Sequence, residues 1–123
     1  DYEKNRKIKY YIINMKAFIL KKSNRKDKKF MILMPELGHK HHFGQKGFKD
    51  YTIYSKELIP DDAYKKKLAY IARHKKNEDW NKSGIHTAGF WSRWILWNEP
   101  TIERSIKDVE KRFDVKIINK VKK

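Results

Sequence analysis

Residues 83–100, with the sequence SGIHTAGFWSRWILWNEP, hold three of the chain's four tryptophans within the length of one helix. Each indole, and the ring of Phe90, buries roughly 150–250 Å² when it is covered. On a helix, Phe90, Trp94 and Trp97 share one face, and Trp91 lies on an adjoining face. A helix that is apolar on nearly all sides must be covered on nearly all sides. This segment is therefore either the centre of the core or a docking surface.

These two interpretations assign the aromatic side chains different roles. In the first, the segment is a central helix packed between a sheet and a helix that starts near Thr101. In the second, it is a protein interface, where Trp and Arg are enriched. Arg93 would then stack on the indoles or reach an acidic group, in this chain or in a partner. The residues expected in the core or in docking are Phe90, Trp91, Arg93, Trp94 and Trp97.

The length of 123 residues fits a single domain over residues 1–123, because only one core of ordinary size is available to such a chain. The chain has 31 Lys and Arg residues against 15 Asp and Glu residues, a formal net charge of +16. This charge repels itself in the folded state unless an acidic partner offsets it. We therefore expect a negatively charged partner. The alternative is a compositional bias, since an AT-rich genome also favours Lys, Ile, Asn and Tyr.

Several classes of protein are excluded by what the sequence lacks. The chain has no cysteine, which excludes disulfides, cysteine-based zinc sites and a cysteine nucleophile. No apolar run approaches the roughly 20 residues of a membrane-spanning helix, and the first residues lack a signal-peptide core. We expect a soluble, intracellular protein with no membrane span. Because the sequence begins at Asp1 rather than Met, we also expect it to be a portion of a longer product.

The first half of the chain, residues 1–59, is expected to contain mainly strands and loops. Residues 7–20 and 30–34 are rich in β-branched and aromatic side chains, which favour strands. Residues 21–29 are polar and basic, as in an exposed hairpin loop, and residues 39–43 supply a third short strand. The pattern predicts a small antiparallel sheet.

The second half, residues 60–123, is expected to be mainly helical. A first helix follows Pro60, with Asp61 and Asp62 at its N-terminus. Its predicted buried face consists of Tyr64, Leu68, Ile71 and Ala72, with Lys65, Lys66 and Lys67 on the opposite side.

Two more helices and a strand complete the prediction. Thr87 is the expected cap of the second helix. The third starts near Thr101, and its apolar spacing makes it the clearest helix in the chain. Residues 115–118 can return as an edge strand beside a lysine-rich tail. The expected fold is thus α+β, with a small antiparallel N-terminal sheet followed by about three helices packed on it.

The histidines near residue 40 are a candidate metal pair. His39 and His41 share one face of a strand, because alternate residues point the same way. A complete site would need the distant His74 or His86 as a further ligand, so surface imidazoles are the preferred interpretation. We predict no metal and no cofactor.

The sequence offers no motif for catalysis. Glu78 and Asp79, with His74, could form a nuclease-like cluster with Mg²⁺, but the two acids more simply pair with neighbouring lysines. The five glycines do not form a phosphate-binding loop. The chain is therefore predicted not to be an enzyme, with a metal-dependent nuclease as the alternative.

Basic clusters favour contact with nucleic acid or with an acidic protein, because each neutralised phosphate releases counterions. Tyr10, Tyr11, Phe18 and Phe30 could stack on bases, although aromatic residues at strand positions are more often core residues. The predicted contact residues are Lys21, Lys22, Arg25, Lys26, Lys28, Lys29, Lys65, Lys66, Lys67, Arg73, Lys75 and Lys76.

Three segments carry a resemblance to a known group of proteins. They are HFGQKGFKDYT at 42–52, YIARHKKNEDW at 70–80 and GFWSRWILWNEPTIERSIKD at 89–108. Together they resemble small basic proteins of unknown function that are encoded by nucleocytoplasmic large DNA viruses, among them mimivirus-like and algal viruses. The resemblance spans about two-thirds of the chain and supplies no catalytic residues.

The resemblance implies a viral origin and no assigned enzyme activity. Such viruses build icosahedral shells with many small proteins beneath the major capsid layer, and they package DNA. We therefore expect a structural virion protein, a minor capsid or internal component that makes charge-driven and Trp-mediated contacts. The alternative is a nonspecific nucleic-acid-binding accessory protein. The expected partners are other virion proteins, the major capsid protein among them, and DNA or RNA. The expected locations are the virion and, during assembly, the host cytoplasm or viral factory.

Overall fold

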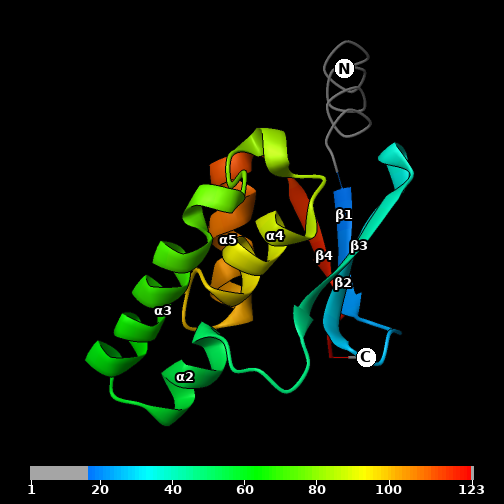
Figure 1. The fold of residues 1–123 in the computed structure, drawn as a ribbon. Helices are drawn as coiled ribbons and strands as arrows, with labels where there is room; N and C mark the ends of the chain where they lie inside the picture. The colour runs from blue at the N-terminus through cyan, green and yellow to red at the C-terminus, as the bar shows by residue number, and fades with distance from the viewer. Residues whose placement is uncertain (1–16, 123) are drawn as a thin grey trace, which may run out of the picture.

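The computed structural model describes residues 17–122, which form one sheet with helices packed against it (Figure 1). This confirms the predicted α+β class. The strands are β1 (Ala17–Lys22), β2 (Lys28–Met34), β3 (His39–Gln45) and β4 (Lys116–Asn119). The α-helices are α2 (Tyr51–Glu57), α3 (Pro60–His74), α4 (Ala88–Trp91) and α5 (Ile102–Phe113). Short helical segments are η1 (Pro35–Leu37), η2 (Lys75–Asn77), η3 (Lys82–Gly84) and the π-helix η4 (Ser92–Leu96).

The sheet has the strand order β3-β2-β1-β4. β1, β2 and β3 are antiparallel neighbours, as predicted. The edge strand predicted at 115–118 forms as β4, but it runs parallel to β1, so the sheet is mixed rather than antiparallel throughout. A parallel pair needs a long crossover connection, and the helical layer supplies it. The strand predicted over 7–20 falls mostly outside the described residues, and only its last part belongs to β1.

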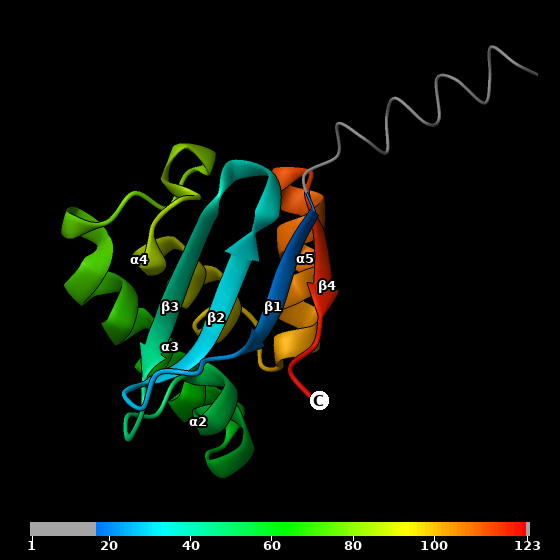
Figure 2. The same ribbon diagram turned by 90° about the vertical axis from the view of Figure 1, so that its right-hand side faces the viewer.

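The helices cover one face of the sheet, and the other face is open in the view of Figure 2. Strand side chains alternate between the two faces. Phe18 is directly opposite Ile117, and Leu20 is opposite Ile32, so these pairs point to the same side. The strand residues in the core are Phe18, Leu20, Ile32, Met34, Phe43 and Ile117.

The β1–β2 loop is shorter than the predicted 21–29. β1 continues through Lys22, and β2 already begins at Lys28. The Ser23 N–H donates to the Lys29 carbonyl oxygen at 3.1 Å and closes the turn. A lysine can occupy a strand position without burial when its ammonium group stays in water, so the basic residues did not end the strands.

Helix α2 was missed by the sequence prediction, which assigned this region to strands and loops. Its residues, YTIYSKE, are mostly β-formers. The signal that outweighs them is Asp50, whose Oδ1 accepts from the N–H groups of Thr52 at 2.9 Å and Ile53 at 3.3 Å. This N-cap satisfies donors that the first helical turn leaves free.

Helix α3 forms where predicted, but of its predicted buried face only Ile71 packs against the core, where it is partly buried. Tyr64 and Leu68 are largely exposed, whereas Ala63 and Tyr70 are buried with Lys67 half-buried between them. Lys67 packs its aliphatic stem against the body while its ammonium reaches a carbonyl group. A face that includes a lysine is not recognised by counting apolar residues.

The tryptophan segment lies at the centre of the fold. Thr87 caps α4, as predicted, and the chain continues into η4, where the Trp97 N–H donates to the Ser92 carbonyl oxygen. Phe18 of β1 meets Trp91 edge to face with ring centroids 5.7 Å apart, and Phe90 lies 4.9 Å from Phe113 of α5. The segment thus packs between the sheet and α5, as the first of the two interpretations predicts.

We predict that Trp91→Ala lowers the free energy of unfolding by about 3–5 kcal/mol, because a fully buried ring would leave a cavity. The measurement is urea unfolding followed by circular dichroism. Ile118→Ala, at an exposed position of β4, is the control and should change stability by less than about 1 kcal/mol. Equal losses in the two variants would contradict the central place of Trp91.

Candidate nucleic-acid interface

The indoles of the tryptophan segment are used inside the molecule. The Trp91 Nε1–H donates to the Ile85 carbonyl oxygen at 2.8 Å, and the Trp94 Nε1–H donates to the Trp80 carbonyl oxygen at 2.9 Å. Phe90, Trp91, Trp94 and Trp97 are all buried. A tryptophan that acts as a docking residue needs an exposed ring, so these rings are core residues in the folded chain.

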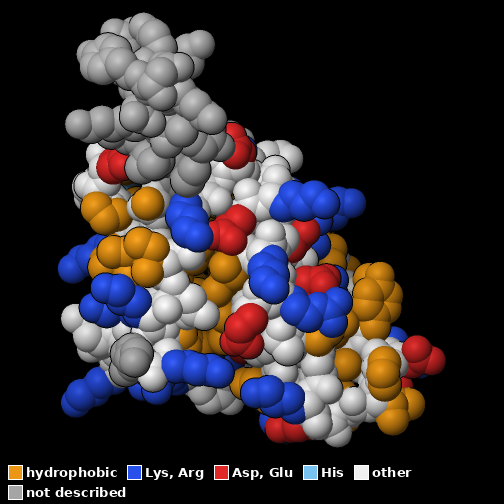
Figure 3. All heavy atoms as spheres, turned by 180° about the vertical axis from the view of Figure 1, so that it is seen from behind, with side chains coloured by type: hydrophobic (Ala, Val, Ile, Leu, Met, Phe, Trp, Pro, Cys, Tyr) orange, Lys and Arg blue, Asp and Glu red, His pale blue; other side chains and the backbone are white. Residues whose placement is uncertain are grey.

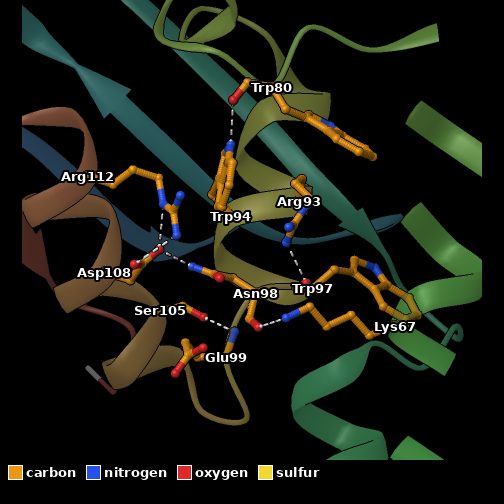
Figure 4. A network of polar contacts seen from close by, with 10 residues as sticks. All are labelled: Lys67, Trp80, Arg93, Trp94, Trp97, Asn98, Glu99, Ser105, Asp108 and Arg112. Carbon is orange, nitrogen blue, oxygen red and sulfur yellow. Dashed lines mark hydrogen bonds and ion pairs between the residues drawn. The ribbon is translucent and has the colours of Figure 1, made fainter. Parts of the chain in front are cut away.

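Arg93 also finds its partners within the chain (Figure 4). Its guanidinium lies 4.3 Å from the ring centroid of Trp94 and 5.5 Å from that of Trp80. The Nη1 atom donates to the Trp97 carbonyl oxygen at 2.8 Å. The stacking expected for Arg93 is therefore present, and the group that its N–H reaches is a backbone carbonyl rather than an acid.

A polar network fixes α3 to α5 through the turn that follows Trp97 (Figure 4). Lys67 Nζ donates to the Asn98 carbonyl oxygen at 2.6 Å, and the Asn98 side-chain amide donates to Asp108 at 2.8 Å. Arg112 donates to both oxygens of the same carboxylate. Burial opposes the charged carboxylate, but the hydrogen bonds from Arg112 and Asn98 outweigh it and lower the pKa of Asp108.

This network places Lys67 apart from the other predicted contact residues. Burial lowers the pKa of the Lys67 ammonium, and nearby Arg93 lowers it further. Its Nζ also lies 5.2 Å from the ring centroid of Tyr51. Lys67 is thus directed into the junction of α3 with the residues around Asn98.

The β1–β2 turn, the end of β3 and the end of β4 lie at one end of the sheet (Figure 2), and basic residues lie in or directly after each of them. The Lys46 N–H donates to the Asp27 carbonyl oxygen at 3.0 Å, which fixes the end of β3 beside the turn. The Lys120 N–H donates to the Leu20 carbonyl oxygen at 2.8 Å, which fixes the tail beside β1. We call this set the hairpin cluster: Lys21, Lys22, Arg25, Lys26, Lys28, Lys46 and Lys120.

The hairpin cluster has little internal neutralisation. Asp27 is the acidic residue of the turn, and Arg25 Nη2 binds it at 3.2 Å. Among the described residues, no acidic group lies within 4.0 Å of the ammonium groups of Lys21, Lys22, Lys26, Lys28, Lys46 or Lys120. The end of the sheet therefore carries several lysines without an acidic partner among the described residues.

A groove of about 440 Å³ adjoins the hairpin cluster, between β3 and the end of α3. Lys28 lines it from the sheet, Arg73 and His74 line it from α3, and the rings of Tyr70 and Trp97 form part of its wall. These two rings are stacked with centroids 4.4 Å apart and planes 3° apart. We call this feature the basic groove.

Two acidic residues also line the basic groove, and each lies against a neighbouring part of the chain. Asp50 is buried, caps α2 and accepts from Lys29 Nζ at 2.8 Å. Glu78 lies against Gly89, where the Cβ of any larger residue would collide with the Glu78 carboxylate oxygens. Lys29 is consequently neutralised within the groove, whereas Lys28 and Arg73 have no ion-pair partner among residues 17–122.

The structure brings together only part of the predicted contact set. Lys21, Lys22, Arg25, Lys26 and Lys28 belong to the hairpin cluster, and Arg73 shares the basic groove with Lys28. The remaining exposed members lie on α3 and η2 and do not line the groove: Lys65, Lys66, Lys75 and Lys76.

Two members of the cluster could not be predicted from the sequence. Lys46 stands alone between two glycine turns, and only its hydrogen bond to the β1–β2 turn places it there. Lys120 lies in the lysine-rich tail, whose position depends on the parallel pairing of β4 with β1. Neither position could be found without the strand order.

The residues predicted to stack on bases are not available as a set. Phe18 is buried against Trp91, and Phe30 is partly buried beside Phe43. Tyr10 and Tyr11 lie outside the described residues. The exposed aromatic ring beside the groove is instead Phe48, which is 64% exposed.

The acidic and histidine residues considered for catalysis have other contacts. Asp79 accepts from the Ser83 hydroxyl at 2.6 Å and from the Asn81 N–H, and these hydrogen bonds lower its pKa. His74 stacks on Tyr70 with ring centroids 4.4 Å apart. Within residues 17–122, no group of three His, Asp or Glu side chains is placed to hold a metal ion.

Comparison with known proteins finds a family match over part of the chain. Residues 18–59, from β1 to just beyond α2, match the model of a family of unknown function, DUF5754. No curated protein matches the chain, and no solved structure matches it. Among the described helices, none has both the length and the apolar character required to cross a bilayer. The matched region includes most of the hairpin cluster, and no enzyme family is found.

His41 is expected to make stability depend on pH. Its Nε2 is enclosed and has no hydrogen-bond partner in the described structure. Burial lowers the pKa of its imidazole, and the nearby His39 and His86 lower it further. Between the lowered pKa and the ordinary value of about 6.5, the unfolded chain therefore binds more protons than the folded protein.

We predict that the free energy of unfolding is highest above about pH 6.5 and decreases as the pH drops below that value. Below the pKa of His41 in the folded protein it should decrease no further from this cause. His41→Gln should show a smaller decline. The measurement is a series of urea-unfolding curves between about pH 8 and pH 5. An identical decline in the variant would show that His41 is not its source.

Proposed function

We propose that this protein binds nucleic acid without reading its sequence, through the hairpin cluster and the basic groove, and that it catalyses no reaction. The observation that carries this proposal is the convergence of three chain segments into one positive surface whose ammonium groups are not used elsewhere in the described structure. A compositional excess of lysine spread over the surface would not require this convergence.

The contact would be electrostatic. Each lysine that neutralises a phosphate releases condensed counterions, and this gain does not depend on base identity. The sheet fixes the backbone of the cluster, while the side chains remain long and flexible. A polyanion would also offset the self-repulsion of a chain with a formal charge of +16.

The test is equilibrium binding to a random-sequence DNA duplex of about 20 base pairs at several salt concentrations. The cluster variant replaces Lys21, Lys22, Lys26 and Lys28 with Gln. We expect its plot of log affinity against log salt to flatten by about 0.9 for each phosphate contact removed. The control replaces Lys56, Lys82, Lys107 and Lys111, exposed lysines on α2, η3 and α5, with Gln.

Both variants lose the same charge, so a difference between them reports position. Equal loss of affinity would contradict a defined site. Polyglutamate tests whether the cluster binds an acidic protein instead of nucleic acid. Binding to polyglutamate as tight as binding to DNA at equal salt would favour an acidic protein as the partner.

A second function, that of a structural virion protein, is favoured by the resemblance of residues 42–52, 70–80 and 89–108 to proteins of large DNA viruses. In that setting the hairpin cluster would meet the packaged genome or the acidic surface of another virion protein, such as the major capsid protein. The burial of the tryptophan segment leaves the basic surface, rather than the indoles, to make these contacts.

This second proposal predicts that peptides of the chain are found in purified virus particles, in constant ratio to the major capsid protein. Mass spectrometry of gradient-purified particles is the measurement. Absence from particles, with presence in the infected cytoplasm, would favour the accessory role over the structural one.

A further inference from the structure

Helix α3 carries an apolar stripe beside the face that packs on its own core. The residues Asp61, Tyr64, Leu68, Ile71 and Lys75 follow the 3-4-3-4 spacing that places side chains along one helix face. Tyr64 is 48% exposed and Leu68 is 46% exposed. We call this set the outer stripe.

The outer stripe is distinct from the face by which α3 packs on the body. The packed face is centred on Ala63, Lys67 and Tyr70, and Ile71 lies at its edge, partly buried against the core. Figure 3, seen from behind, shows hydrophobic side chains gathered at its right, on the side of the molecule where α3 lies. Because Ile71 is partly buried against the core, Tyr64 and Leu68 are the apolar residues of the stripe that the fold of one chain leaves exposed.

The charges along α3 indicate what covers the stripe. Asp61 and Asp62 lie in its first turn, and Arg73 lies in its last turn, followed directly by Lys75 and Lys76. An antiparallel neighbour with the same sequence would place acidic residues beside basic ones at both ends. A parallel copy would place like charges together, and an acidic or lipid surface would meet Asp61 and Asp62.

We propose that the outer stripe is a dimer interface that packs against the same stripe of a second copy, in an antiparallel arrangement about a two-fold axis. A two-fold interface must be complementary to itself, and the acidic start and basic end of the stripe meet that condition. With Leu68 on the axis, Asp61 faces Lys75 of the second copy, since each lies seven residues from Leu68. Tyr64 then faces Ala72 of the second copy. The antiparallel helix dipoles favour the same arrangement.

The first experiment exchanges charges between the ends of the stripe. Sedimentation velocity over a range of protein concentrations measures the dissociation constant of the unmodified chain, Asp61→Lys, Lys75→Asp and the double variant. Each single substitution places like charges opposite each other twice, so we expect dimerisation to weaken roughly tenfold or more. The double variant restores opposite charges and should recover most of the affinity.

The double variant also distinguishes the pairing between copies from a local effect on α3. It still carries a lysine in the first turn of α3, where a positive charge is unfavourable, so any recovered affinity comes from the restored ion pairs. Recovery in the double variant therefore supports the proposed register. No recovery, or an unmodified chain that remains monomeric at every concentration it reaches, would overturn the proposal.

A second experiment tests the apolar centre of the stripe. Leu68→Asp should abolish dimers, whereas Leu37→Asp, at a leucine of η1 with a similar exposure of 42%, should not affect them. Circular dichroism of both variants shows whether the fold is kept. Dimers that persist in Leu68→Asp, or that disappear equally in Leu37→Asp, would contradict an interface at this stripe.

Discussion

The contact between Phe18 of β1 and Trp91 of α4 joins the sheet to the helical layer, and the remaining helices depend on the aromatic cluster around it. Phe90 and Trp94 continue the cluster to Phe113 of α5, and Trp97 continues it to Tyr70 of α3. Buried aromatic rings contribute large apolar areas and have preferred pair geometries. One short segment therefore positions α3 and α5 relative to the sheet.

Because these rings are buried, the groups available for binding are those that remain on the surface. The indole N–H groups of Trp91 and Trp94 bind backbone carbonyls, and Arg93 binds the carbonyl of Trp97. The lysines at the end of the sheet and along the basic groove, by contrast, mostly have no acidic partner among the described residues. The proposed function by charge rests on this difference.

An element could be predicted from the sequence where a single pattern determined its local structure. The apolar spacing after Thr101 predicted α5, and the residues around 115–118 predicted the last strand. It was insufficient where a second interaction outweighed the pattern. Asp50 caps a helix made mostly of β-forming residues, and Lys67 occupies the packed face of α3, to which apolar counting assigned Tyr64 and Leu68.

Most basic residues of the candidate site could be predicted from the sequence, but their arrangement in space could not. The lysines of the β1–β2 turn could be found as a run in the sequence. Their association with Lys46 and Lys120 depends on backbone hydrogen bonds between strands that are distant in the chain. Arg73 reaches the same region because the end of α3 lies across the basic groove from β3, and no local pattern encodes that placement.

The central claim is that the indoles between residues 91 and 97 are enclosed by the chain itself. Acrylamide quenching of tryptophan fluorescence tests it directly, using Trp80→Phe to remove the partly exposed fourth indole and dilute protein to exclude association. The account predicts weak quenching in buffer and strong quenching in concentrated urea. Quenching in buffer as strong as that of the unfolded chain would contradict it.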